Sequence, residues 1–137
     1  MKNVDKTIVD IFKPETNVNL LVPFFEEVRA GFPTEVFSEG EVSIDLNKEL
    51  IRNPEATFYA RVKGLSMTGC GIDDGDLVII DRSLEPEDGK IAVCFLDGEF
   101  TLKRIKKDKQ VIWLVPENPS FPLIKVDERN QFQIWGI

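Results

Sequence analysis

The sequence contains no histidine, and this absence excludes the commonest designs of a catalytic site. Without an imidazole there can be no Ser–His–Asp triad, no Cys–His pair and no metal site built on histidine. A serine nucleophile in this chain would therefore need another side chain to take its proton. Lysine is the obvious candidate, because serine and lysine form a known variant of the triad.

Cysteines and long apolar runs are also scarce. Cys70 and Cys94 do not form a CxxC pair, and two cysteines make no disulfide framework, so both are interpreted as reduced thiols. Cys70 stays a minor candidate nucleophile. No apolar run approaches the ~18 residues of a membrane span, and the first residues lack the apolar core of a signal peptide. We therefore expect a cytoplasmic protein without a membrane partner, and we expect neither a metal nor a cofactor.

Basic residues are too few for a protein that binds DNA through its overall charge. The 17 lysines and arginines face 24 acidic residues, which gives a net charge of −7. Phosphate binding depends on Lys and Arg, so no direct DNA binding is expected. The 137 residues, 42% of them hydrophobic, are enough for one domain with a modest core.

The stretch from residue 58 to residue 81 carries most of the recognisable chemistry. It begins and ends with residues typical of β-strands, and four glycines interrupt its centre: Gly64, Gly69, Gly71 and Gly75. Ser66 lies at the start of this interruption. Glycine-rich backbone lets amide groups approach a bound oxyanion, because no Cβ blocks the way. The alternative is an ordinary glycine-rich connection with a serine in a turn.

A lysine stands in the middle of a predicted strand over residues 99–105. Side chains alternate between the faces of a strand, so Thr101, Lys103 and Ile105 share one face. At the ordinary lysine pKa of about 10.4, roughly one lysine in 2,500 is neutral at pH 7, and burial lowers that pKa. Thr101 could orient the amine by a hydrogen bond. The alternative is a lysine that extends from an edge strand into solvent.

The rest of the chain divides into an arm and a β-rich body. Residues 1–40 are predicted to form an extended N-terminal arm, with one or two helical turns near residues 23–30. Residues 41–137 are predicted to form a small, highly curved, mostly antiparallel sheet or partial barrel. We expect a short helix or turn over 45–52, a charged turn over 106–110, and strands over 57–63, 77–81, 91–96, 99–105, 111–115, 124–126 and 132–137.

Several segments together resemble the LexA/UmuD/phage-repressor family of self-cleaving serine peptidases. They cover nearly all of residues 30–136 in the order of that family. They are Ala30-Gly-Phe-Pro33, Ile44-Asp-Leu-Asn47, Asn53-Pro-x-Ala-Thr57, Gly64-x-Ser-Met67, Gly71-Ile-x-x-Gly-Asp-Leu77, Asp97-Gly-Glu-Phe-Thr-x-Lys103 and Pro116-x-Asn118.

The resemblance implies a site and a fold. Ser66 matches the nucleophile of the family and Lys103 its general base, so the resemblance implies a Ser–Lys dyad. The backbone amides of Ser66 and Met67 would form the oxyanion hole. Ala30-Gly31 matches the pair of residues that is cut, with Ala30 on the acyl side. The fold implied is the LexA/signal-peptidase-like β fold.

The same resemblance implies a role in the SOS response and a set of partners. These are a second copy in a homodimer, a RecA filament on single-stranded DNA that promotes the cleavage, and an error-prone (UmuC-like) DNA polymerase that the shortened product joins in translesion synthesis. Residues 1–30 carry four basic and five acidic groups, so their removal hardly changes the net charge. We infer that cleavage acts by uncovering surface and freeing the arm.

Two rival interpretations stay open. Bacterial signal peptidases also use Ser–Lys chemistry, but they need a membrane anchor, for which this sequence has no candidate. A non-catalytic β-barrel module for protein interaction would use the glycine stretch structurally, and its basic run at Lys103–Lys109 could meet an acidic partner. That run also fits a solvated hairpin turn.

Overall fold

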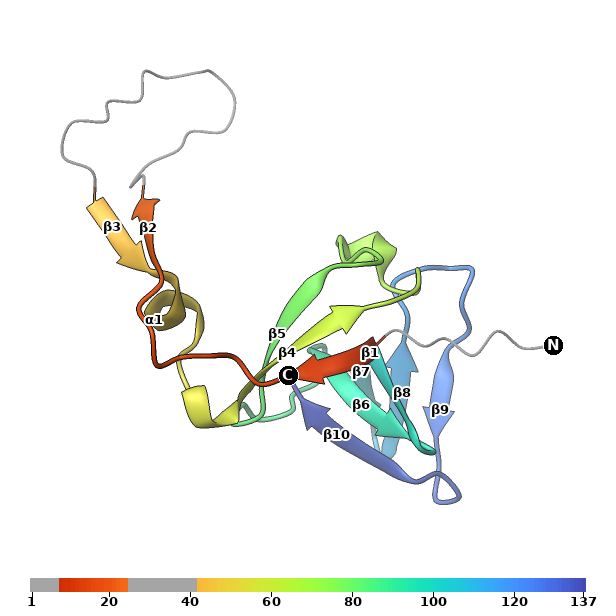
Figure 1. The fold of residues 1–137 in the computed structure, drawn as a ribbon. Coiled ribbons are helices and arrows are strands. Elements are labelled where there is room, and N and C mark those ends of the chain that lie inside the picture. Colours follow the sequence, from red (N-terminus) through yellow and green to blue (C-terminus); the bar gives the residue numbers. More distant parts are fainter. Residues whose placement is uncertain (1–7, 25–41) are drawn as a thin grey trace.

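A computed structural model describes residues 8–24 and 42–137 (Figure 1). Short strands dominate this part of the chain. In order the elements are β1 (Ile8–Phe12), β2 (Leu21–Phe24), β3 (Val42–Asp45), α1 (Leu46–Leu50), η1 (Pro54–Ala56), β4 (Thr57–Val62), η2 (Thr68–Cys70), β5 (Leu77–Asp81), β6 (Ile91–Leu96), β7 (Glu99–Asp108), β8 (Val111–Val115), β9 (Ile124–Val126) and β10 (Phe132–Gly136).

The strands form three antiparallel groups. The largest sheet has the order β10-β6-β7-β8-β9, a second has the order β1-β4-β5, and β2 pairs with β3 alone. The sheets curve around each other without closing into a barrel (Figure 1). The predicted fold class, a mostly β and mostly antiparallel structure, is confirmed.

The hairpin of β6 and β7 is built on a two-residue turn. Asp97 and Gly98 have φ values of 47° and 88°, the left-handed conformation that such turns require and that Gly and Asp tolerate. This turn fixes the register, which places Ala92 opposite Lys103 and Cys94 opposite Thr101. The local sequence therefore decides where Lys103 lies on the sheet.

Strand β7 is longer than the sequence predicted. The residues expected to begin a charged turn, Lys106 to Asp108, continue the strand because they pair with Val111–Trp113 of β8. The turn is confined to the two residues that follow, and Lys109 has a φ of 56°. Lys106 and Lys107 are exposed, so their charges stay in water while their backbone completes the ladder.

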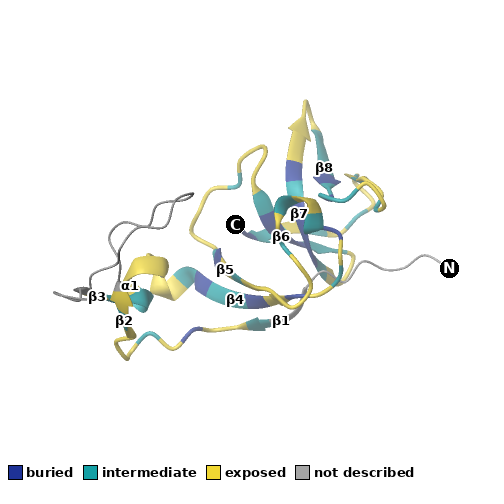
Figure 2. Ribbon diagram, turned by 90° about the horizontal axis from the view of Figure 1, so that it is seen from above, coloured by how far each residue is buried: buried dark blue, intermediate teal, exposed yellow. Residues whose placement is uncertain are grey.

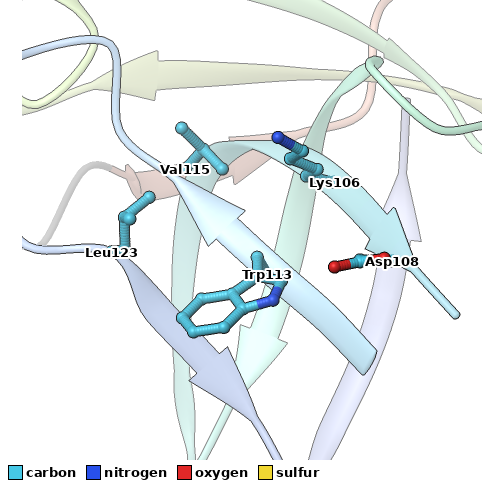
Figure 3. A pocket seen from close by; sticks show the side chains of 5 residues that line it. All are labelled: Lys106, Asp108, Trp113, Val115 and Leu123. Carbon is cyan, nitrogen blue, oxygen red and sulfur yellow. The ribbon is translucent and has the colours of Figure 1, made fainter. Parts of the chain in front are cut away.

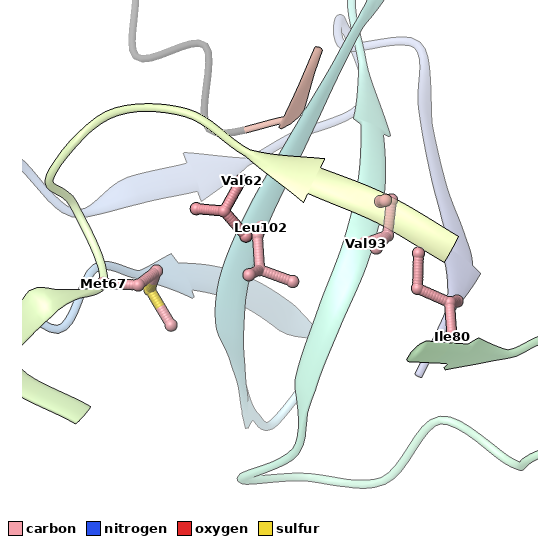
Figure 4. Close-up of a cluster of buried hydrophobic side chains, with 6 residues drawn as sticks. Val62, Met67, Ile80, Val93 and Leu102 are labelled. Atoms are coloured by element: carbon pink, nitrogen blue, oxygen red, sulfur yellow. The ribbon is translucent and has the colours of Figure 1, made fainter. Parts of the chain in front are cut away.

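Two groups of buried side chains form the core. The first joins the two larger sheets and consists of Ala60, Val62, Met67, Ile80, Val93 and Leu102 (Figure 4). The second lies within the five-stranded sheet and consists of Ala92, Cys94, Ile105 and Leu114. Burial is concentrated along the middle of β4, β6 and β7, whereas α1 and the far end of β7 are exposed (Figure 2).

The described part of the predicted arm is made of strands. Strand β1 lies in the body beside β4, whereas β2, β3 and α1 form an extension that projects from it (Figure 1). The short helix predicted over 45–52 is confirmed as α1, and Asp45 caps it by accepting a hydrogen bond from the Asn47 amide at 3.0 Å. Pro23 and Phe24 lie in β2, and the other residues for which helical turns are predicted, 25–30, lie outside the described residues.

The helices found between residues 8 and 24 and between 42 and 137 are all too short or too polar to cross a membrane.

Candidate active site

Ser66 follows the end of β4, on a loop that is held at its start. Gly64 has a φ of 98°, and its amide donates a hydrogen bond of 2.7 Å to Oδ1 of Asp74. Only glycine adopts this backbone conformation readily, so the sharp departure from the strand needs it. Ser66 itself is fully buried, with an exposed fraction of 0%. The glycine stretch thus delivers a serine into the interior of the protein.

The next residues anchor the loop from its other side. Met67 inserts its side chain into the core beside Val62 and Leu102 (Figure 4), and it is 1% exposed. Its carbonyl oxygen accepts hydrogen bonds from the amides of Cys70 and Ile72. A long apolar side chain and a turn of 3-10 helix therefore fix the backbone directly after the serine.

Lys103 reaches the same place from β7. It is buried, with an exposed fraction of 1%, and its Nζ lies 3.2 Å from Oγ of Ser66. The same Nζ lies 2.7 Å from Oγ1 of Thr101 and 3.2 Å from the carbonyl oxygen of Leu102. The structure thus brings together three of the residues singled out in the sequence, Ser66, Thr101 and Lys103.

The surroundings of the two thiols, Cys70 and Cys94, differ from those of the pair formed by Ser66 and Lys103. Burial raises the pKa of the Cys94 thiol to about 12, and the charge of Lys103 opposes this rise only in part. Cys94 is therefore protonated at neutral pH, and a thiol in that state is a poor nucleophile. Cys70 is partly buried, and its Sγ lies 3.1 Å from the carbonyl oxygen of Met67. The Ser66 hydroxyl, by contrast, has Nζ of Lys103 within hydrogen-bond distance.

A brace from the loop after β8 supports the serine loop, and the sequence analysis did not find it. The carbonyl oxygen of Glu117 accepts a hydrogen bond of 2.7 Å from the Gly69 amide. Nδ2 of Asn118 donates to the carbonyl oxygen of Leu65 at 2.8 Å. The carboxylate of Glu117 in turn forms an ion pair with Arg104, the residue after Lys103. The brace therefore connects the serine loop to the lysine strand.

We predict that Gly69→Ala loosens this brace and slows self-cleavage. An added Cβ would collide with the carbonyl oxygen of Glu117, so the two loops must move apart. Overpacking of this kind costs about 1–3 kcal/mol, and a displacement of about 1 Å at a reacting group costs roughly 10²-fold in rate. Thermal unfolding and the rate of appearance of the cut product would measure the two effects.

Gly98→Ala is the matched control for this substitution. Gly98 has a φ of 88° and open space around its Cβ position, so alanine strains the turn without touching the brace. We expect a comparable loss of stability without a comparable loss of rate. Equal cleavage rates in the two variants would contradict a positioning role for the contact between Gly69 and Glu117.

The roles assigned to the predicted site residues stay predictions. The Ala30–Gly31 bond lies outside the described residues. The 3-10 turn that follows Met67 engages the amides of Thr68, Gly69 and Cys70 with carbonyl oxygens. The amides of Ser66 and Met67 precede this turn, and their assignment to an oxyanion hole rests on the sequence resemblance.

Two surface hollows lie apart from the Ser–Lys pair. One of about 330 Å³ lies over β7 and β8 next to the start of β9, and is lined by Lys106, Asp108, Trp113, Val115 and Leu123 (Figure 3). The other, of about 380 Å³, lies between the end of α1, strand β5 and the last residue of the chain, and its lining includes Leu50, Ile79 and Ile137. Neither lining contains Ser66 or Lys103, so neither hollow belongs to the Ser–Lys pair.

Similarity to a family of known peptidases defines the class of the protein as a serine peptidase. The family model described as Peptidase S24-like matches residues 23–137, and the chain belongs to this family. The predicted membership of the LexA/UmuD/phage-repressor group of self-cleaving peptidases is therefore confirmed.

Curated relatives agree with this membership over most of the chain. Protein SamA of Salmonella typhimurium is 40% identical over 114 residues, which cover 83% of this chain and 79% of SamA. Protein MucA of Escherichia coli is 34% identical over 132 residues, which cover 94% of this chain and 90% of MucA. A LexA repressor of Acidithiobacillus ferrooxidans is 40% identical over 121 residues, 85% of this chain and 58% of the repressor.

Proposed function

We propose that the chain cuts its own Ala30–Gly31 bond with a Ser–Lys dyad, in which Ser66 is the nucleophile and Lys103 the general base. The observation that carries this proposal is the distance of 3.2 Å between Oγ of Ser66 and Nζ of Lys103, both of them buried. That distance is within the range of a nucleophile and its base. The chain has no histidine that could compete for the role.

The surroundings of Nζ favour the neutral amine as the reacting form. A neutral amine has two N–H groups and one lone pair. Two oxygens, Oγ1 of Thr101 and the carbonyl of Leu102, lie within hydrogen-bond distance and can accept those two N–H groups. The lone pair can then point toward the Ser66 hydroxyl, 3.2 Å away, and accept its proton. Burial acts in the same direction, because a low dielectric disfavours the charged form of an amine.

The first half of the reaction forms an ester. Nζ of Lys103 takes the hydroxyl proton while Oγ of Ser66 attacks the carbonyl carbon of Ala30. Backbone amides at Ser66 and Met67 stabilise the oxyanion that results. When the tetrahedral intermediate collapses, the bond to the nitrogen of Gly31 breaks. The ammonium of Lys103 gives its proton to that nitrogen, and the new N-terminal amine leaves.

The second half of the reaction releases the serine. Lys103, neutral again, takes a proton from a water molecule that attacks the ester carbonyl. The ester bond breaks, Oγ of Ser66 regains a proton from Lys103, and the free carboxylate of Ala30 is produced. One water is consumed, and the enzyme returns to its starting state. Thr101 is a positioning residue in this scheme, because it contacts the amine and not the bond that is cut.

The reaction takes place in the SOS response, where the chain is a mutagenesis protein that cuts itself. The two free thiols, Cys70 and Cys94, support a reducing cytoplasmic location. RecA filaments on single-stranded DNA promote the cleavage, the protein is a homodimer, and the shortened product joins an error-prone polymerase in translesion synthesis. The resemblance of the sequence to its family supports these partners, and the net charge of −7 argues against direct DNA binding.

We predict that self-cleavage speeds up as pH rises through and above neutral. Below the pKa of the base, each pH unit raises the neutral fraction of an amine about tenfold, and the rate should follow that fraction. Incubation of the full chain over a series of pH values, with mass spectrometry of the two pieces, would test this. The expected pieces end at Ala30 and begin at Gly31.

The outcome also separates the peptidase from a non-catalytic interaction module. A chain that stays intact at pH 10, both alone and with RecA filaments, would favour the interaction module. A rate that rises with pH but persists in Lys103→Arg would show that another group is the base, because a guanidinium stays protonated throughout this range.

A further inference from the structure

Strand β1 is part of the body, although it belongs to the segment that cleavage would separate from it. It pairs antiparallel with β4, with Ile11 opposite Ala60 and Phe12 opposite Tyr59 (Figure 1). Ile11 packs against the core group that contains Ala60 and Val62, which are 0% and 1% exposed. Strand β5 pairs with β4 on its other side, so β1 covers the remaining edge of β4.

The residue after β1 is anchored by its charge. Nζ of Lys13 donates hydrogen bonds to the carbonyl oxygens of Pro54, at 2.7 Å, and Thr57, at 3.2 Å. It also lies 4.5 Å from the centre of the Phe58 ring, a favourable position for a cation over an aromatic face. Phe58 is held in turn by an edge-on contact with Trp135, 5.0 Å between ring centres. The anchor therefore rests on both larger sheets.

A second set of contacts holds the segment between β1 and β2. Nδ2 of Asn47 donates to the carbonyl oxygen of Val18 at 2.7 Å. The Leu20 amide donates a hydrogen bond of 3.0 Å to Oδ1 of Asp45. The Leu46 amide donates one of 2.8 Å to the carbonyl oxygen of Leu20. Residues 8–24 are thus joined to residues 42–62 at several places, and a cut after Ala30 breaks none of these bonds.

We propose that the edge of β4 is a binding site for an extended peptide, and that the N-terminal fragment keeps filling it after the cut. This inference rests on the proposed cleavage at Ala30–Gly31. The ligand is a strand with an apolar side chain at the position of Ile11 and a lysine two residues later. Its backbone pairs with β4. Its apolar side chain packs against the core as Ile11 does, and its lysine donates to the carbonyl oxygens that Lys13 contacts.

The cost of an empty site explains why the fragment stays. Without β1 the backbone groups along one edge of β4 lose their partners, and the buried side chains of Ala60 and Val62 are uncovered next to them. An exposed apolar edge is a template for pairing with other chains. The cut product is therefore a nicked complex of two pieces, and this inference replaces the expectation from the sequence that the cut by itself frees the arm. Its fragment leaves when another extended segment takes its place on β4.

The test cuts the chain at the same bond without using the Ser–Lys pair, so that retention of the fragment is measured independently of self-cleavage. A recognition sequence for a site-specific protease is inserted at the Ala30–Gly31 bond in the Ser66→Ala background, so that the cut does not need Ser66. After cleavage at micromolar concentration, native mass spectrometry and gel filtration compare the pieces. We expect one complex with one copy of each piece. Separate elution of the N-terminal fragment would overturn the proposal.

Variants identify the contacts that retain the fragment. Lys13→Ala removes the anchor without touching the core, and Ile11→Asp places a charge against Ala60; each should speed release at least tenfold. Val18→Asp is the control, because Val18 is 65% exposed and the charge change is the same as at Ile11. If Lys13→Ala releases the fragment no faster than Val18→Asp does, the contacts of Lys13 do not retain the fragment.

A labelled peptide probes the site itself. A peptide with the sequence of residues 6–15 should exchange into the nicked complex and not into the uncut chain, and the same peptide with aspartate at the Ile11 position should not enter. Equal binding of the two peptides would overturn the assignment. The two proposals can fail separately. If the wild-type chain does not cut itself but the protease-cut chain keeps its fragment, the proposed self-cleavage is wrong and the binding site on β4 is supported.

Discussion

Replacement of Ser66 by alanine is expected to abolish self-cleavage, with a loss of roughly 10⁴-fold or more in rate. The hydroxyl is the atom that attacks in the proposed scheme. The Thr101 hydroxyl also lies beside Lys103, but in that scheme it holds the amine and does not attack. The fold should persist, because one hydroxyl group removed from a packed site costs about 1 kcal/mol. Mass spectrometry after incubation at high pH would detect any residual product.

Cys70→Ala is the control for this result. Cys70 lies in the same loop and is the alternative nucleophile in the sequence, so its variant should be cut at the wild-type rate. A Ser66→Ala chain that still gives the product beginning at Gly31 at the wild-type rate would contradict the assignment. Loss of cleavage in Cys70→Ala, with an intact fold, would point to the thiol instead.

Lys103→Met should be equally inactive at every pH, and it should be no less stable than the wild type. Methionine has a similar length and fills the space of the lysine side chain without a charge. Replacement of a buried ionisable group by an apolar one is often neutral or stabilising by about 1–4 kcal/mol. The loss of the contact with Thr101 offsets part of this gain, so we expect between no change and a gain of about 2 kcal/mol.

The control lies on the same strand. Lys106→Met removes an exposed lysine from β7, so it should leave both the cleavage rate and the free energy of unfolding close to those of the wild type. Chemical unfolding and the cleavage assay would be run side by side on the two variants. A Lys103→Met chain that still cuts would show that a different base serves Ser66.

The sequence predicted the elements whose causes are local. The Asp97–Gly98 turn and the alternation in β7 put Lys103 on the face of Thr101, and the structure has this register. Periodicity alone did not predict that Lys103 meets Ser66. That expectation came from the family resemblance, because the two residues lie 37 positions apart and their contact depends on how two sheets pack.

The features that the sequence did not predict depend on contacts between distant segments. Gly69 meets Glu117 across two loops, and neither residue carries a local signal of its partner. Residues 8–12 belong to the predicted arm and carry no local signal of a partner, yet their pairing with β4 decides their conformation. The run Lys106–Asp108 has the composition of a turn, and its pairing with β8 overrides that preference.

The pairing of β1 with β4 has a consequence for the order of events during translation. The N-terminal residues leave the ribosome first, and domains begin to form as the chain emerges. Ile8 has its partner as soon as Val62 is available, well before Lys103 has been synthesised. The nascent chain can therefore protect this edge before its nucleophile acquires a base.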